Sequence, residues 1–163
     1  MDSPDEDYEE ATTLNGKLGL INGEYEIFSH DIADYSPYDK EFNLALCLAG
    51  GGIWGRFEFG SFEGILHMPQ RPAVSSFDEI PFTWRGQAEG DGMSFGPNNE
   101  GFIRFLGGGK IEGMIHWLGR MRFWGQRYSG QDSGPPRDIR ELQDEWDGYN
   151  EYEYERERVA RWR

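Results

Sequence analysis

Three histidines and one cysteine are the side chains of this 163-residue chain that most often bind metals or act as bases and nucleophiles. His30, His67 and His116 each stand alone, without a second ligand at a spacing typical of metal sites. HDIAD (30–34) sets carboxylates beside the first histidine, but aspartate-rich loops are usually solvated turns. Cys47 lies among apolar residues, which indicates a buried thiol rather than an activated one. We therefore predict no catalytic residue, no metal and no cofactor, and an enzyme is the less favoured class.

Arginines and tryptophans lie close together in two segments, FTWRGQ (82–87) and RMRFWGQRY (120–128). Arginine stacks on aromatic rings and binds carboxylates in a fork, so these segments are candidates for holding an apolar or anionic ligand. Two arrangements are open. The arginines pair outside with glutamates of neighbouring strands, which is favoured, or some of them point into the fold and hold the ligand. The candidate ligand-binding residues are Trp54, Trp84, Arg85, His116, Arg122 and Trp124.

Near the carboxyl end the spacing of apolar residues becomes that of a helix. Four of them recur at intervals of three and four, which predicts one apolar stripe. These candidate partner-binding residues are Ile139, Leu142, Trp146 and Tyr149. The stripe either covers an open end of the preceding domain or binds a protein partner. Covering is favoured, because a short linker holds the helix close to its own domain.

Between residues 14 and 129, apolar side chains recur at every second position in short runs separated by turn residues, which predicts antiparallel strands. Asn22-Gly23 separates the first two runs and predicts a hairpin between KLGLI (17–21) and EYEIFS (24–29). HDIADYSPYDK (30–40) is predicted to be a loop. The fold class that follows is all-β, an antiparallel up-and-down meander forming a barrel or strongly curved sheet, with one C-terminal α-helix.

Glycine, glutamate and a second glycine recur in three similar phrases, FGSFEGIL (59–66), FGPNNEGFI (95–103) and GGGKIEGMI (107–115). The first glycine suits a tight turn, and the second lies just inside the returning strand, where glycine indicates a bend. We expect each phrase to mark a β-hairpin of one curved sheet. Large aromatic side chains of neighbouring strands are expected to cover the interior glycines.

The chain has a net charge of −14, which opposes binding to nucleic acid and to anionic membranes. It opens on an acidic stretch rather than a signal peptide, and no apolar run approaches the roughly 20 residues of a membrane helix. An intracellular location, cytoplasmic or nuclear, is the expectation. The predicted segments are an acidic disordered tail (1–13), a β-barrel domain (14–129), a linker (130–136) and a charged amphipathic helix (137–163).

The strand series with its Gly52-Ile53-Trp54 element resembles the lipocalins and related calycins, eight-stranded barrels that hold one small ligand. In that family the Gly-x-Trp element opens the first strand, whereas here it follows three predicted strands. GIWGRFEFGSFEGIL and IPFTWRGQAEGDGMSFG, within residues 23–127, resemble a group of uncharacterised proteins common in filamentous fungi. That second resemblance implies a lineage and no mechanism.

Together these patterns predict a non-enzymatic binding module. Its expected partner is a protein, bound through the acidic surface or the C-terminal helix. The alternative is a lipocalin-like carrier that holds a small apolar or anionic ligand in the barrel interior.

Overall fold

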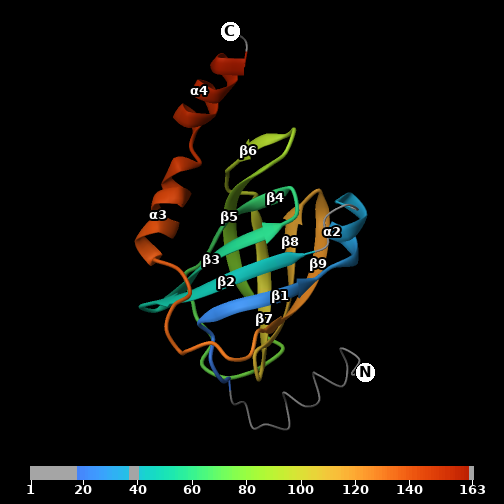
Figure 1. Cartoon of the computed structure of the whole chain (residues 1–163), viewed down its shortest axis with the longest axis vertical. Coiled ribbons are helices and arrows are strands. Elements are labelled where there is room, and N and C mark those ends of the chain that lie inside the picture. The colour runs from blue at the N-terminus through green and yellow to red at the C-terminus, as the bar shows by residue number, and fades with distance from the viewer. Residues whose placement is uncertain (1–17, 37–40, 162–163) are drawn as a thin grey trace.

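The computed structural model describes residues 18–36 and 41–161, so the predicted acidic tail, residues 1–13, lies outside the described residues. Within them the chain forms nine strands and three helices (Figure 1). The strands are β1 (Gly23–Phe28), β2 (Phe42–Ala49), β3 (Gly52–Phe59), β4 (Phe62–Met68), β5 (Ile80–Ala88), β6 (Gly92–Ser94), β7 (Glu100–Gly107), β8 (Lys110–Trp117) and β9 (Gly119–Arg127). The helices are α2 (His30–Tyr35), α3 (Ile139–Gly148) and α4 (Glu151–Arg161).

Eight strands close an antiparallel barrel in the order β1, β2, β3, β4, β5, β7, β8, β9, and β9 pairs again with β1. The ninth strand, β6, pairs with the last residues of β5, while β7 pairs with the first residues of β5. Neighbours in the barrel are also neighbours in the chain once β6 is set aside. The predicted all-β, up-and-down barrel is therefore confirmed.

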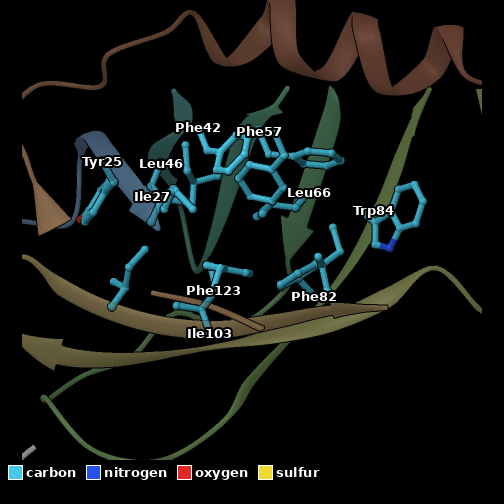
Figure 2. Packing of buried hydrophobic residues seen from close by; sticks show 14 of the residues in the cluster. Tyr25, Ile27, Phe42, Leu46, Phe57, Leu66, Phe82, Trp84, Ile103 and Phe123 are labelled. Atoms are coloured by element: carbon cyan, nitrogen blue, oxygen red, sulfur yellow. The ribbon is translucent and has the colours of Figure 1, made fainter. Parts of the chain in front are cut away.

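Phenylalanines and one tryptophan fill the barrel interior, and Figure 2 shows several of them pointing inward from different strands. Three of the phenylalanines lie directly across from glycines on the next strand: Phe57 from Gly64, Phe82 from Gly101, and Phe123 from Gly113. A methyl group on any of these glycines would collide with the facing ring. The expectation that aromatic side chains cover the interior glycines is confirmed. Two of the three glycine phrases mark hairpins, between β3 and β4 and between β7 and β8, whereas β6 and β7 are not paired.

The predicted first strand is wrong in its described part. Residues 18–21 form no strand, so Asn22 and Gly23 do not join a hairpin. Ile21 is instead buried against the core where β1 begins, and its carbonyl accepts a hydrogen bond of 2.6 Å from the Tyr25 hydroxyl. The Asn22 side chain accepts a 2.7 Å hydrogen bond from the backbone N–H of Leu48, which ties this segment to β2. Two apolar residues of the run, Leu18 and Ile21, therefore pack against the core at this end of the barrel, while Leu20 is exposed.

The predicted loop at 30–40 contains the short helix α2 in its described part. Ser29 begins the helix, because its hydroxyl accepts a hydrogen bond from the backbone N–H of Ile32. Ile32 is fully buried in the barrel core, and nearby Trp117 stacks on Phe62 with ring centroids 3.8 Å apart. The helix and this tryptophan close the end of the barrel at which β1 finishes (Figure 1).

The single helix predicted over 137–163 is two helices in the described residues, α3 and α4. The chain turns at Tyr149 and Asn150. The Asn150 side chain accepts a 2.9 Å hydrogen bond from the backbone N–H of Glu153, as an asparagine does when it begins a new helix.

Candidate functional site

The six candidate ligand-binding residues do not converge. Trp54 and Arg85 lie on the outer wall beneath α3, and Trp84 lies inside the barrel, 1% exposed. The other three, His116, Arg122 and Trp124, lie on the outside of β8 and β9. Consecutive residues of a strand point to opposite faces, so Trp84 and Arg85 do not line the same surface.

The interior holds packed side chains. Trp84 donates from its ring nitrogen to the His116 carbonyl at 3.2 Å, and its ring meets Phe57 and Phe62 edge to face. Where β1 begins, Tyr25 and Ile111 border a space of about 10 Å³, which has room for one water at most. The strand arginines Arg56, Arg85, Arg104 and Arg122 all make their contacts on the outside or are exposed there.

On one side of the barrel, α3 packs across the outer faces of β3 and β4. Leu142 and Tyr149 are buried there, and the Trp146 ring meets Trp54 edge to face at 5.6 Å. The cluster consists of Cys47, Ile65, Leu142 and Tyr149, bordered by Trp54, Met93, Phe95, Ile139 and Trp146. The helical stripe therefore binds its own barrel. It covers the wall and not an end, because the outward positions of β2, β3 and β4 carry the apolar residues Cys47, Trp54 and Ile65.

Two arginines hold α3 in this position. Arg85 donates to the carbonyls of Trp146 and Tyr149 at 3.1 and 3.3 Å, and its guanidinium lies 4.4 Å from the centre of the Trp146 ring. A cation at the last carbonyls of a helix also complements the helix dipole. Arg56 forms an ion pair with Glu145 of α3 at 3.1 Å. Trp54, Arg85 and the helical stripe therefore take part in holding α3 against the barrel.

The opposite side of the barrel carries a different outer surface, formed by β7, β8, β9 and the end of β1 (Figure 1). Outward-facing positions on these strands are cross-strand partners: Phe102 with Met114, Met114 with Arg122, and Phe28 with Trp124. Phe28 is 43% exposed and Trp124 is 37% exposed. We call this surface the open face and define it by Phe28, Phe102, Met114, Arg120, Arg122 and Trp124.

A shallow groove crosses the open face. Its volume is about 190 Å³, and both open-face arginines, Arg120 and Arg122, line it together with Phe102 and Met114. Arg104 forms one wall, where it pairs with Glu112 at 2.9 Å and with Glu79 at 3.0 Å.

The guanidinium groups of Arg120 and Arg122 differ from those of the other strand arginines. Neither makes an ion pair or side-chain hydrogen bond with any described residue. The backbone of Arg122 is fixed on both sides, because its N–H donates to Asp31 at 2.8 Å and its carbonyl accepts from Ser29 at 2.6 Å. Two exposed cations without a partner among the described residues thus lie on β9, in a chain whose net charge is −14.

Sequence reasoning found Arg122 and Trp124 of the open face but missed Arg120, Phe102, Met114 and Phe28. The signal for Arg120 was present, since it precedes Arg122 by two residues and must share its face. The others depend on the barrel order, which brings β7, β8, β9 and β1 side by side.

In the part of the chain that the structure describes, no three side chains of His, Cys, Asp or Glu gather as metal ligands do. None of its helices has the length and apolar composition needed to cross a membrane. Comparisons with protein-family models, with curated proteins and with solved structures find no match. The resemblances to a fungal group and to calycin barrels stay predictions.

Proposed function

We propose that the chain is a non-enzymatic protein-binding module whose open face binds an acidic segment of a partner protein. The observation that supports this most is that the guanidinium groups of Arg120 and Arg122, beside the exposed ring of Trp124, have no partner in the part of the chain that the structure describes. Arginine, tryptophan, methionine and phenylalanine are the residue types enriched in protein interfaces.

The chemistry of the partner follows from the charges. A guanidinium binds a carboxylate through two parallel hydrogen bonds, and the open face offers two such groups that form no ion pair within the described residues. The carboxylates that line the same groove, Glu79 and Glu112, pair with Arg104. The overall charge of −14 repels an acidic partner at long range. Screening limits that repulsion to a distance of about 8 Å at physiological salt, so local pairing decides the outcome at contact.

The size of the groove favours a peptide segment. Pockets for small molecules usually have volumes of roughly 300–1,000 Å³. The groove of about 190 Å³ is smaller and open, and it suits one side chain of a chain lying across the strands. The lipocalin-like carrier needs an interior cavity, and aromatic rings occupy the described interior. No observation favours that alternative.

The proposal is tested with two fluorescently labelled peptides of equal length. One carries aspartate and glutamate around a central tyrosine, and the other has asparagine and glutamine in their place. We expect the acidic peptide to bind more tightly, and the double substitution Arg120→Ala/Arg122→Ala to weaken it by about tenfold or more. Arg140→Ala is the matched control, because Arg140 is exposed on α3 and its side chain also has no described partner.

Two results would contradict the proposal. One is equal binding of the two peptides, and the other is an affinity for the acidic peptide that the double substitution leaves unchanged. A loss of affinity in the Arg140→Ala control equal to that of the double variant would show a general charge effect, and it would count against the open face as well.

A further inference from the structure

Helix α4 carries a second exposed surface, on the side of the molecule away from the open face. The helix extends beyond the barrel (Figure 1), and only one side of it is anchored, where the Tyr154 ring meets Phe95 edge to face at 6.2 Å. On its other side Tyr152 is 71% exposed and Val159 is 48% exposed. An open hollow of about 460 Å³ runs between them, lined also by Glu155, Arg156 and Ala160.

The four main residues of this surface form a symmetric pattern. Glu155 and Arg156 lie at its centre, while Tyr152 precedes and Val159 follows that pair by three positions each. All four share one helical face, because they are spaced by three, four and seven residues. If two such helices lie antiparallel about a two-fold axis between positions 155 and 156, each acid faces the base of the other copy. Each tyrosine then faces a valine.

A two-fold interface requires this kind of reciprocity, in which one residue contacts a second residue of the other copy and the second contacts the first. The charges along α4 favour the same arrangement. Glu151 and Glu153 precede the midpoint, and Arg158 follows it, so antiparallel pairing sets the acidic half of one helix against the basic half of the other. With four glutamates and three arginines, α4 has a net charge of −1, and two copies repel each other less here than over the rest of a chain of charge −14.

The same order of charges also stabilises an isolated helix through its dipole, so it does not by itself indicate that two helices pair. The ion pairs within the helix, Glu155 with Arg158 at 2.9 Å and Arg156 with Glu153 at 3.6 Å, are exposed and therefore weak. Glu155 and Arg156 can therefore give up these partners within the helix and pair with the other copy. The helix dipole does not explain why the two large apolar residues of the exposed side lie at equal distances from that centre.

We infer that α4 is a self-association surface, through which two copies of this chain pair their α4 helices antiparallel with Tyr152 against Val159 and Glu155 opposite Arg156. The inference is independent of the proposed function of the open face. The contact between two helices of 11 residues is small, so the dimer is weak and reversible. The antiparallel arrangement places the two barrels at opposite ends of the helix pair.

Disulfide trapping tests the register directly. Tyr152→Cys and Val159→Cys are made in separate chains, then oxidised alone and as an equal mixture. Two copies of position 152 lie about 10 Å apart along an antiparallel pair, beyond disulfide reach, whereas positions 152 and 159 face each other. We expect a linked dimer in the mixture and little in either chain alone. The native Cys47 is buried, and the unsubstituted chain is the control for it.

Equal linking in either single variant alone, or no linking in the mixture, would overturn the inference. Sedimentation gives a second measurement that does not depend on cysteine chemistry. We expect Glu155→Arg to weaken the dimer by about tenfold, and the double exchange Glu155→Arg/Arg156→Glu to restore it, since the exchanged charges again face each other.

Glu157→Arg is the matched control for sedimentation, because it makes the same change of charge on the other side of the helix. If the substitutions at positions 155 and 157 act alike, or if the double exchange stays as weak as the single variant, the register is wrong. An unsubstituted chain that remains monomeric at millimolar concentration would contradict self-association itself.

Discussion

At the scale of single residues, the strand arginines divide into two groups by what they contact. Arg56 contacts three glutamates, and Arg104 contacts two. Arg85 binds the carbonyls at the end of α3. Arg120 and Arg122 have no such contacts within the described residues, so the fold does not need their charges.

This division predicts effects on stability of different size. We expect Arg56→Ala to lower the free energy of unfolding by about 1–2 kcal/mol, because a half-buried network with α3 is lost. Arg122→Ala should change it by less than about 0.5 kcal/mol. Denaturant unfolding of both variants, followed by circular dichroism, measures the difference. A loss of stability in Arg122→Ala as large as that in Arg56→Ala would show that Arg122 has a structural role.

His67 predicts a dependence on pH. It stacks on Trp54 with ring centroids 4.2 Å apart, and burial lowers the pKa of its imidazole in the folded chain. The unfolded chain then binds a proton more readily than the folded one. The stability that neutral His67 contributes is full above its ordinary pKa of 6.5 and is lost as the pH falls through the lowered value. We expect His67→Gln to reduce the loss of stability on acidification. Identical pH profiles of unfolding in both chains would contradict this.

For single residues, the sequence indicates which candidates lie on opposite faces, because side chains alternate along a strand. The order Trp84-Arg85 already implied one inward and one outward side chain. What the sequence could not show is that Arg85 would meet the end of α3, 61 residues later. Contacts between such distant segments depend on how the elements pack.

At the scale of elements, the interior glycines allow the barrel to curve around its phenylalanines. Gly101→Ala should destabilise the chain by about 1–3 kcal/mol, because the added methyl group collides with the Phe82 ring and the neighbouring backbone. Gly148→Ala is the control, since nothing lies within 4 Å of its new methyl group and it ends a helix. It should stabilise the chain slightly. Thermal unfolding measures the stability of both variants. An equal change in the two would show that the Phe82 ring does not exclude a side chain at Gly101.

The docking of α3 can be followed through the thiol that it covers. Cys47 is buried beside Leu142, and its pKa is raised by burial. Leu142→Ala removes buried apolar contacts, which costs about 2–4 kcal/mol, and α3 should then leave the wall more often. We expect Cys47 to react with a thiol reagent many times faster in this variant, while the far-ultraviolet circular dichroism of the barrel is retained. Unchanged reactivity would mean that α3 does not protect the thiol.

Most strands were predictable because alternation is a local signal, and each sheet-forming run carries its own turn residues. Residues 18–21 resemble a strand because Leu18, Leu20 and Ile21 are apolar, yet Leu18 and Ile21 pack against the barrel core while Leu20 is exposed. The short helix α2 escaped prediction because six residues are too few to show a helical period. Asparagine often begins a helix, as Asn150 does here, but the run around it looks continuous, so the break between α3 and α4 was not predicted.

At the scale of the whole molecule, closure of the barrel decides which surfaces remain for binding. The eight barrel strands pair in a closed ring, and among the described strands the short β6 has a free edge, so the outer faces are the larger surfaces that a partner can bind. The helix α3 covers one of these faces, and within the described residues no helix covers the opposite one (Figure 1). The sequence predicted the barrel but not this asymmetry, because the position of α3 depends on the apolar residues that project outward from β2, β3 and β4.

The central claim is that this uncovered side, with Arg120, Arg122 and Trp124, binds an acidic segment. Mapping amide chemical shifts while the acidic peptide is titrated into the isotope-labelled chain tests the location most directly. The account predicts that the largest shifts fall on β8 and β9, around positions 114 and 120–124, and that they fade as salt is added. Shifts that fall mainly on α3 and β3, or inside the barrel, would contradict it.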